Sequence, residues 1–252
     1  MKKRSAKRIL INIICLFIPI KRYRKLLRSK IKQVPVKEVK QNKFHNNKIL
    51  LVQQNGNIIE NPTHIPGIQI EFLGDNNYIE IHEPCNFWDS KIVIRNAKVI
   101  IQSGINSNLI IESLDGKFSE INIGKNFTSS GTALIQAWPG KANVTIGEDC
   151  MFSWDTKIKI SDNHVIFDKD SGKILNPNKD VVIGNHVWVG WHVFILKGSQ
   201  IGDNSIIGAG STVTKAFKEQ NVIITGNPAK IIRRGIGWDR ANHEEYLRKF
   251  KK

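Results

Sequence analysis

Hydrophobic residues recur at every sixth position between residues 183 and 213. A period of six fits neither the 3.6-residue repeat of an α-helix nor the two-residue alternation of a single exposed strand. It predicts a triangular coil, in which each hexad supplies one flat side and one corner and three hexads complete a turn. The repeating positions are Ile183, Val189, Ile195, Ile201, Ile207 and Val213, and a glycine follows four of them, at Gly184, Gly190, Gly202 and Gly208.

Residues eighteen positions apart stack on one another in such a coil. We therefore expect each aliphatic position to lie over its counterpart one turn later, as Ile183 over Ile201, and to point into a continuous core. The glycines would relieve the corners, where a Cβ atom is crowded.

The same phase continues upstream of this block. Ile146, Phe152 and Ile158 are also spaced by six, and short strand-like runs with turn signals between them fill residues 49–145. We interpret 49–145 as less regular coils of the same solenoid, with a capping pair of strands at 49–67. From Ile158 to Ile183 is 25 residues, which is not a multiple of six. Residues 161–180 are charged and rich in turn residues, so they are predicted to form an inserted, protruding loop.

The predicted organisation is therefore an all-β parallel β-helix with extensions at both ends. The segments are a basic amphipathic segment at 1–32, a linker at 33–48, the coils of 49–145, the hexapeptide-repeat region of 146–229, and a basic extension with a short helix at 230–252.

The excess of basic residues is concentrated at the two ends of the chain. The formal charge of +16 arises from about +13 in residues 1–40 and +5 in residues 230–252, which leaves the body at −2. A nucleic-acid-binding protein more often spreads basic residues over a folded face, so nucleic acid is not an expected partner. The three cysteines form no CxxC pair, so we expect no disulfide framework and a reducing compartment.

Residues 9–20 (ILINIICLFIPI) are apolar and have basic residues on both sides. A stretch of this length is too short for a bilayer, which needs about 20 apolar residues, and no signal-peptide cleavage site follows it. The pattern favours a segment that lies on an anionic membrane surface, with packing on the protein's own body as the alternative. The expected location is cytoplasmic, with peripheral contact at the inner face of the plasma membrane.

The block IGNHVWVGWHVFILKGSQIGDNSIIGAGSTVTK, followed by GNPAK, resembles the hexapeptide-repeat acetyltransferases, and CMFSWDTKIKISDNHVIFD resembles those that O-acetylate bacterial capsule and lipopolysaccharide sugars. The resemblance covers about residues 146–237, and it implies a left-handed coil. It also implies a homotrimer with active sites between neighbouring subunits, and direct acetyl transfer from acetyl-CoA to a carbohydrate hydroxyl.

In this resemblance the catalytic base is His164, which stands on the predicted loop. Histidine suits the role because its unperturbed pKa, about 6.5, is close to working pH. Asp162 is the second catalytic candidate, since either it or Asp168 could orient the ring or accept a hydrogen bond from the sugar.

The resemblance also implies a path for the cofactor. Trp188 would form a wall near the thioester, and glycine and alanine on later coils would let the CoA arm approach the backbone. Basic side chains would bind the CoA phosphates. Some relatives have an aromatic residue at the position of Thr214, so the contact there differs. The candidates are Trp188, Gly190, Gly208, Ala209, Thr214, Lys215, Pro228, Lys230 and Arg233.

Trp154 and Asp155 precede the loop by half a coil and are the candidates for binding the acceptor. Trp191 and Phe194 could build either acceptor surface or a subunit interface.

Three other functions remain open. A metal enzyme on this fold, like the γ-class carbonic anhydrases, would use histidines such as His186 and His192, but six-residue spacing puts these on different sides of the coil, and no metal is expected. An amino-sugar N-acetyltransferase would usually carry a Rossmann-like domain, and residues 1–145 contain no GxGxxG after a strand. A non-catalytic scaffold is the third alternative.

Overall fold

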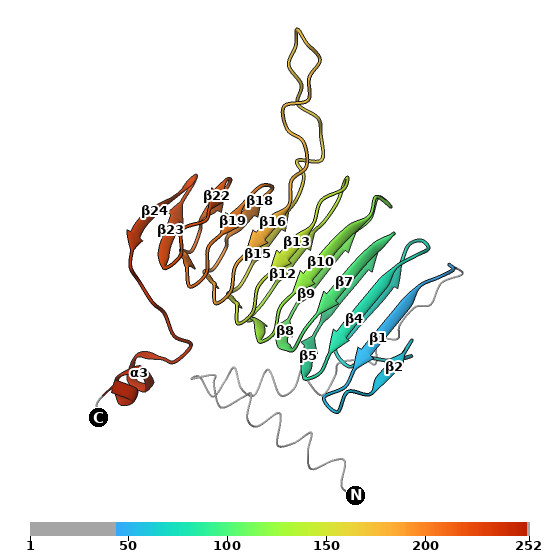
Figure 1. Cartoon of the computed structure of the whole chain (residues 1–252), viewed down its shortest axis with the longest axis horizontal. Helices are drawn as coiled ribbons and strands as arrows, with labels where there is room; N and C mark the ends of the chain where they lie inside the picture. The colour runs from blue at the N-terminus through green and yellow to red at the C-terminus, as the bar shows by residue number, and fades with distance from the viewer. Residues whose placement is uncertain (1–43, 251–252) are drawn as a thin grey trace, which may run out of the picture. The chain divides into compact units, whose positions relative to one another are not determined.

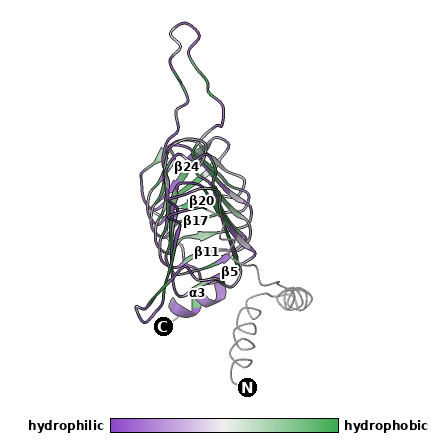
Figure 2. Ribbon diagram, turned by 90° about the vertical axis from the view of Figure 1, so that its right-hand side faces the viewer, coloured by the Kyte–Doolittle hydropathy of each residue, from purple (hydrophilic) through white to green (hydrophobic). Residues whose placement is uncertain are grey.

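The computed structural model describes residues 44–250, which all belong to one compact unit, Lys37–Lys252. Within this part of the chain, 24 strands and one helix are formed, and the strands wind through three sheets in turn (Figure 1). Each turn of the coil contributes strands to the three sheets in the same order. The described residues therefore form a three-sided prism, which Figure 2 shows end-on.

Each sheet runs the length of the prism, and its strands follow one another in a fixed spatial order. Sheet B consists of β2 (Ile58–Glu60), β1 (Lys48–Val52), β4 (Tyr78–His82), β7 (Ala97–Ile101), β10 (Ser119–Ile123), β13 (Val144–Ile146), β16 (Val181–Ile183), β19 (Gln200–Ile201) and β22 (Ala216–Phe217). Sheet C consists of β24 (Ala229–Arg234), β23 (Val222–Gly226), β20 (Ile206–Ile207), β17 (Trp188–Val189), β14 (Met151–Phe152), β11 (Phe127–Ser129), β8 (Gly104–Ser107) and β5 (Cys85–Trp88). Sheet A consists of β21 (Thr212–Val213), β18 (Phe194–Leu196), β15 (Thr156–Lys159), β12 (Ala133–Gln136), β9 (Leu109–Ser113), β6 (Ser90–Ile94) and β3 (Ile68–Phe72).

The register of these strands confirms the eighteen-residue stacking. Ile183 pairs with Ile201 in sheet B, and the equivalent pairs in sheets C and A are Val189 with Ile207 and Ile195 with Val213. All six side chains are buried, as are the isoleucines, valines and phenylalanines stacked beneath them. The aliphatic positions of the repeat therefore form the predicted continuous core.

The phase also holds across the inserted segment. Ile146 pairs with Ile183 and Ile158 pairs with Ile195, so residues 161–180 leave the coil and return to it without disturbing the stacking. Upstream, the coils of 49–145 have mostly longer strands, which join the same three sheets, so they are irregular in sequence rather than in backbone path. The capping pair expected at 49–67 is present as the antiparallel strands β1 and β2.

The corners of the prism use asparagine, aspartate and histidine as well as glycine. At the corner between sheets B and C, five stacked residues have φ between 52° and 58°: Asn126, Asp149, His186, Asn204 and Asn221. Asparagine and aspartate adopt this left-handed conformation more readily than most residues, because their short polar side chains bond locally. Four of these turns fall three residues after an inward isoleucine, and Asn221 falls four residues after Phe217.

The glycines that follow the aliphatic positions have a different role. A Cβ atom added to Gly190 would lie 2.7 Å from the backbone nitrogen of Ala209, and one added to Gly184 would lie 2.9 Å from the nitrogen of Asp203. The next coil thus occupies the space of a side chain, which agrees with the predicted crowding.

The C-terminal end of the prism is closed by a hairpin and a returning segment. Strands β23 and β24 pair antiparallel, and their turn contains the cis Asn227–Pro228 peptide. Residues 235–241, which we call the C-terminal strap, then cross back toward sheet C and lead to helix α3 (His243–Phe250). Asn242 and Glu245 bond to each other's backbone amides, which is a capping box.

The predicted membrane-surface segment, residues 1–32, and most of the linker lie outside the described residues. Residues 44–47, at the end of that linker, are bonded to the first coil; the Asn47 carboxamide, for example, accepts from the Asn77 amide. Among the described residues, no helix has the length and apolar character needed to cross a bilayer.

Candidate active site

The inserted loop projects from the corner between sheets A and B. It leaves the coil after β15 and returns at β16, and it stands well clear of the prism in Figures 1 and 2. Near its tip, an isolated antiparallel bridge joins Phe167 to Ile174. The Asp168 carboxylate accepts from the amide and hydroxyl of Ser171, and these bonds hold the pKa of Asp168 below its usual range. Asp168 thus stabilises the turn at the tip.

His164 lies exposed on this loop, as predicted. Its imidazole has no hydrogen-bond partner among residues 44–250, whereas its backbone is held in place. The Asn176 carboxamide donates to the His164 carbonyl at 2.9 Å and accepts from the Ile166 amide at 2.6 Å. Asn176, which the sequence analysis did not identify, thus fixes the backbone on both sides of the histidine.

Asp162 lies at the base of the loop and does not contact the His164 ring. Its carboxylate accepts from the Asn176 side chain at 2.8 Å and forms an ion pair with Lys197 on the next coil. The Lys197 ammonium is the main reason why the pKa of Asp162 lies below its usual range. In this arrangement Asp162 orients Asn176, and through it the backbone at His164.

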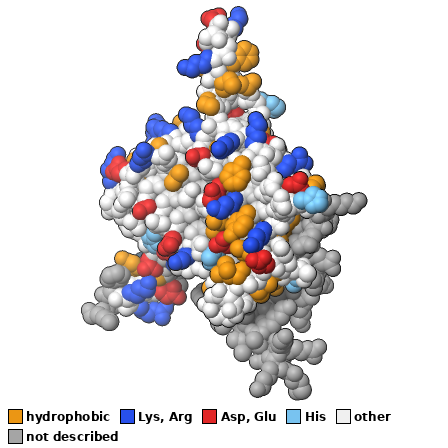
Figure 3. Space-filling model, turned by 45° about the vertical axis from the view of Figure 1, so that its right-hand side comes forward, with side chains coloured by type: hydrophobic (Ala, Val, Ile, Leu, Met, Phe, Trp, Pro, Cys, Tyr) orange, Lys and Arg blue, Asp and Glu red, His pale blue; other side chains and the backbone are white. Residues whose placement is uncertain are grey.

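The loop also exposes apolar side chains, some of which are visible in Figure 3. Five of them are 56–58% exposed, namely Val165, Ile166, Phe167, Ile174 and Leu175. A protruding segment with this much uncovered apolar surface is typical of a contact with another protein surface.

Trp188 lies on sheet C with its side chain outward and 37% exposed. The C-terminal strap supports it from one side: the Trp238 ring stacks on His186 at 4.0 Å and lies 6.1 Å from the Trp188 ring. The Trp238 indole nitrogen also donates to the His186 carbonyl at 2.8 Å. Trp238 was not predicted, because it lies outside the hexad phase.

Arg240 anchors the strap to two successive turns of the coil. Its guanidinium donates to the Asp149 carboxylate and to the Thr128 hydroxyl, both at 2.8 Å. It also donates to the carbonyl oxygens of Asn126, Asp149 and Cys150. The planar fork of arginine suits such a multiple contact.

Within one chain, His164 and Trp188 lie on opposite sides of the prism. The loop leaves the corner between sheets A and B, and sheet C, which contains Trp188, is the side facing that corner. The structure therefore does not bring the predicted base and the predicted thioester wall together in a single subunit.

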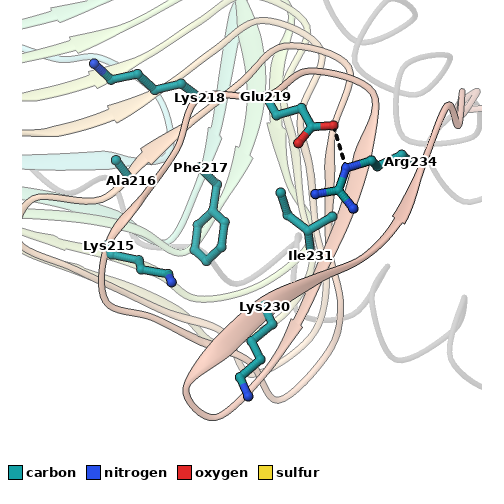
Figure 4. A pocket seen from close by; sticks show the side chains of 8 residues that line it. All are labelled: Lys215, Ala216, Phe217, Lys218, Glu219, Lys230, Ile231 and Arg234. Carbon is teal, nitrogen blue, oxygen red and sulfur yellow. Dashed lines mark hydrogen bonds and ion pairs between the residues drawn. The ribbon is translucent and has the colours of Figure 1, made fainter.

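The remaining cofactor candidates fall into two groups. Lys215 and Lys230 line a cavity of about 410 Å³ at the C-terminal end of the prism, together with Phe217 and Arg234 (Figure 4). Arg234 was not predicted, and its Nε donates to Glu219 at 2.8 Å. Arg233, which was predicted, is exposed on β24 and does not line this cavity.

The second group lies at the corner between sheets C and A. Ala209 lines a shallow hollow of about 520 Å³ with Gly210, Trp191, His192 and the predicted acceptor residue Asp155. Gly190 and Gly208, two glycines predicted to contact CoA, pack closely against the next coil; a Cβ atom added to Gly208 would lie 2.6 Å from the Thr225 hydroxyl. Thr214 is exposed after β21, and Pro228 is exposed in the β23–β24 turn.

The two histidines considered as metal ligands lie at different corners. His186 Nδ1 is 2.6 Å from the Asp149 carboxylate, and His192 Nδ1 is 2.6 Å from that of Asp155. Among residues 44–250, no group of three or more His, Cys, Asp or Glu side chains could hold a metal ion.

Comparison with known proteins adds to this geometry. Residues 180–215 match the family described as "Bacterial transferase hexapeptide (six repeats)". The polysialic acid O-acetyltransferase of Neisseria meningitidis is 34% identical, over 68% of this chain and 80% of that protein. The chain belongs to the hexapeptide-repeat acetyltransferase family.

This membership identifies the coil as the left-handed parallel β-helix of hexapeptide-repeat acetyltransferases. The crystal structure of the polySia-specific acetyltransferase NeuO superposes with a TM-score of 0.66 and 30% identity, over 83% of this chain and 96% of that one. The polysialic acid O-acetyltransferase of Escherichia coli O1:K1 is 37% identical over 56% of this chain, and the match spans 45% of that protein's length.

Proposed function

We propose that this hexapeptide-repeat acetyltransferase uses acetyl-CoA to O-acetylate a hydroxyl of a bacterial surface polysaccharide, capsule or lipopolysaccharide, or of its precursor. The observation that carries the proposal is the similarity to the Neisseria enzyme, which extends over most of both chains. That relative is named for O-acetylation of polysialic acid.

His164 is the proposed general base. It accepts the proton of the acceptor hydroxyl as the oxygen attacks the thioester carbonyl, and it returns that proton to the CoA sulfur as the C–S bond breaks. A new C–O bond replaces the C–S bond, and no metal or redox partner is needed. The exposed imidazole, on a backbone fixed by Asn176, supports this role.

The proposed active site is shared between copies of the chain. His164 and Trp188 lie on opposite sides of one prism, so one subunit must supply the histidine and another the tryptophan. The uncovered apolar side chains of the loop support docking on a neighbouring copy. A closed homotrimer, the arrangement implied by the family resemblance, satisfies this requirement with three equivalent sites.

For the donor, we place the thioester end against Trp188 and the phosphates against Lys215 and Lys230. Both lysines line one cavity at the C-terminal end, where they could neutralise phosphate charge. The arm between these ends would pass the small side chain of Ala209. Residues 1–32, which lie outside the described part of the chain, are proposed to hold the enzyme at the inner face of an anionic membrane.

A complementation experiment tests both the base and the shared site. His164→Ala and Trp188→Ala subunits should each be inactive in acetyl-CoA turnover with polysialic acid, because each lacks one part of every site. Co-expressed as mixed oligomers, they should recover about a quarter of the wild-type activity, since each site draws its two residues from randomly paired subunits.

Separately purified variants, mixed without subunit exchange, are the control and should stay inactive. Activity in the His164→Ala protein alone would contradict the general-base assignment. If the mixed oligomers recovered no activity, the result would contradict the shared site. Mass spectrometry of the product should find the acetyl group as an ester, and an acetyl amide would contradict O-transfer.

A further inference from the structure

Two large aromatic side chains stand exposed at equivalent positions on one corner of the prism. Trp154 and Trp191 are 63% and 65% exposed, and both lie between sheets C and A. They lie on neighbouring coils, because Lys157 and Phe194, each three residues after one of the tryptophans, pair with each other in sheet A. Neighbouring coils are spaced by about 4.8 Å, so the two indoles form a short stripe along the prism axis.

The Trp154 ring is held in place by a glycine on the preceding coil. A Cβ atom added to Gly131 would lie 3.0–3.2 Å from three atoms of the indole, which is tighter than ordinary contact. One face of the ring therefore covers Gly131, while much of the side chain remains open to solvent. A flat aromatic group fixed on one side loses little conformational entropy when a ligand stacks on the other.

Polar groups with fixed orientation surround this stripe. The Asp155 carboxylate lies between the Lys157 ammonium, at 3.0 Å, and His192 Nδ1, at 2.6 Å. Trp191, His192 and Asp155 line the hollow of about 520 Å³ that Ala209 and Gly210 also border. The hollow is thus apolar on its aromatic surface and rich in hydrogen-bonding groups at its edge.

This combination fits a sugar ring better than an apolar protein surface. The C–H face of a pyranose packs on an indole, while its hydroxyl groups need carboxylate and imidazole partners at the rim. Protein interface cores are depleted in charged residues, whereas three charged or titratable side chains adjoin these tryptophans.

We propose that Trp154 and Trp191 form a platform that binds sugar units of the acceptor glycan beside the unit that is acetylated. The proposal rests on the proposed function and adds a subsite to it. Trp154, Trp191 and Ala209 lie on three successive coils, in that order. Ala209 is the one that lies on the proposed donor path. The glycan would therefore extend from the reaction centre toward the earlier coils, and the donor toward the later ones.

The test compares long and short acceptors on the full-length enzyme. For Trp154→Ala and Trp191→Ala, the KM for long polysialic acid should rise about tenfold, because one aromatic contact is lost, while kcat stays unchanged. Trp154 does not line the hollow that contains Ala209, so the KM for acetyl-CoA should also stay unchanged in Trp154→Ala. The KM for monomeric sialic acid should change little, because a monomer has no neighbouring unit that could reach the platform. Phe118→Ala, which removes another exposed aromatic group from the prism, is the matched control and should behave as wild type.

Two further measurements distinguish a glycan platform from a contact between copies of the chain. Gly131→Ala, which retains the Trp154 indole but shifts its position, should also raise the KM for the long polymer. Retardation of His164→Ala protein in gels containing polysialic acid measures binding without turnover, and it should be lost when Trp154 is also replaced.

An unchanged KM and unchanged retardation would overturn the proposal. A change of oligomeric mass in the tryptophan variants would also overturn it, because it would assign the stripe to a contact between copies. Retardation without turnover in the wild type would leave the platform in place and contradict only the proposed reaction.

Discussion

Single residues set the path of this coil through two separate restrictions. The inward positions must be aliphatic, because each side chain is stacked between equivalents on the coils before and after. The corners must accept a positive φ, and among the described residues asparagine, aspartate and histidine adopt it at more positions than glycine does. Each hexad is therefore constrained at its inward and corner positions, and in several hexads also at the glycine after the aliphatic residue, while the other outward positions are free to carry function.

A charge introduced at an inward position should prevent folding. Ile201 is buried between Ile183 and Phe217, so Ile201→Asp would place an unpaired carboxylate in the core and cost more than about 4 kcal/mol. Gln200→Asp, at the outward neighbouring position of the same strand, is the control and should fold normally. Circular dichroism and thermal unfolding measure the difference; a stable Ile201→Asp protein would contradict the inward assignment.

How far the sequence predicts the molecule also depends on particular residues. The period of six predicts the sheets and their register, since every coil repeats the same steric requirement, and it locates the loop as a break in phase. It cannot predict Trp238, Arg240 or Asn176, because these side chains act through contacts between segments that share no repeat. Asp162 was expected either to orient the His164 ring or to accept a hydrogen bond from the sugar, and the sequence could not predict that its carboxylate bonds to Lys197 and Asn176.

At the scale of elements, the loop is an extension whose order depends on a small polar cluster at its base. Lys197 on the coil bonds to Asp162 and to the Asn176 carbonyl, and Asn176 holds the backbone at His164 and Ile166. The position of the catalytic candidate thus depends on a group of contacts outside the hydrophobic core.

Protonation of Asp162 should loosen the loop only in acid. Its pKa is lowered in the folded state, so its ion pair stabilises the loop above the unfolded pKa of about 3.9, and this contribution is lost as the pH falls through the lower, folded pKa. At pH 7, hydrogen exchange of the Ile166 amide should be up to about fivefold faster in Asp162→Asn, because an exposed pair is worth at most about 1 kcal/mol. Below the folded pKa the two proteins should converge.

Asp170→Asn, at the loop tip, is the control for this experiment and should match the wild type at every pH. A difference between Asp162→Asn and wild type that persisted after Asp162 is protonated would mean that the carboxylate acts through something other than its charge.

At the scale of the whole molecule, the enzyme body and its extensions differ in net charge. The body is close to neutral, while the first 40 residues carry about +13. Such a segment would attract anionic lipid, with a contribution of about 1 kcal/mol for each basic residue near the surface.

Removal of residues 1–30 should therefore abolish binding to phosphatidylserine-containing vesicles without reducing the acetylation of a soluble glycan acceptor. Co-sedimentation measures the binding, and vesicles of neutral lipid are the control, since they should bind the full-length protein far more weakly. If the truncated protein still sediments with the anionic vesicles, another surface makes the contact.

The C-terminal strap has a consequence for the order of synthesis. Successive coils can stack as they leave the ribosome, because each needs only the one before it. Arg240, in contrast, bonds to Thr128 and to the Asn126 carbonyl, which are 112 and 114 residues earlier in the chain. A nascent chain can thus complete its prism before Trp238 is made, and the support beside Trp188 is added last. Translation that stops before residue 238 would leave a folded prism in which Trp188 lacks that support.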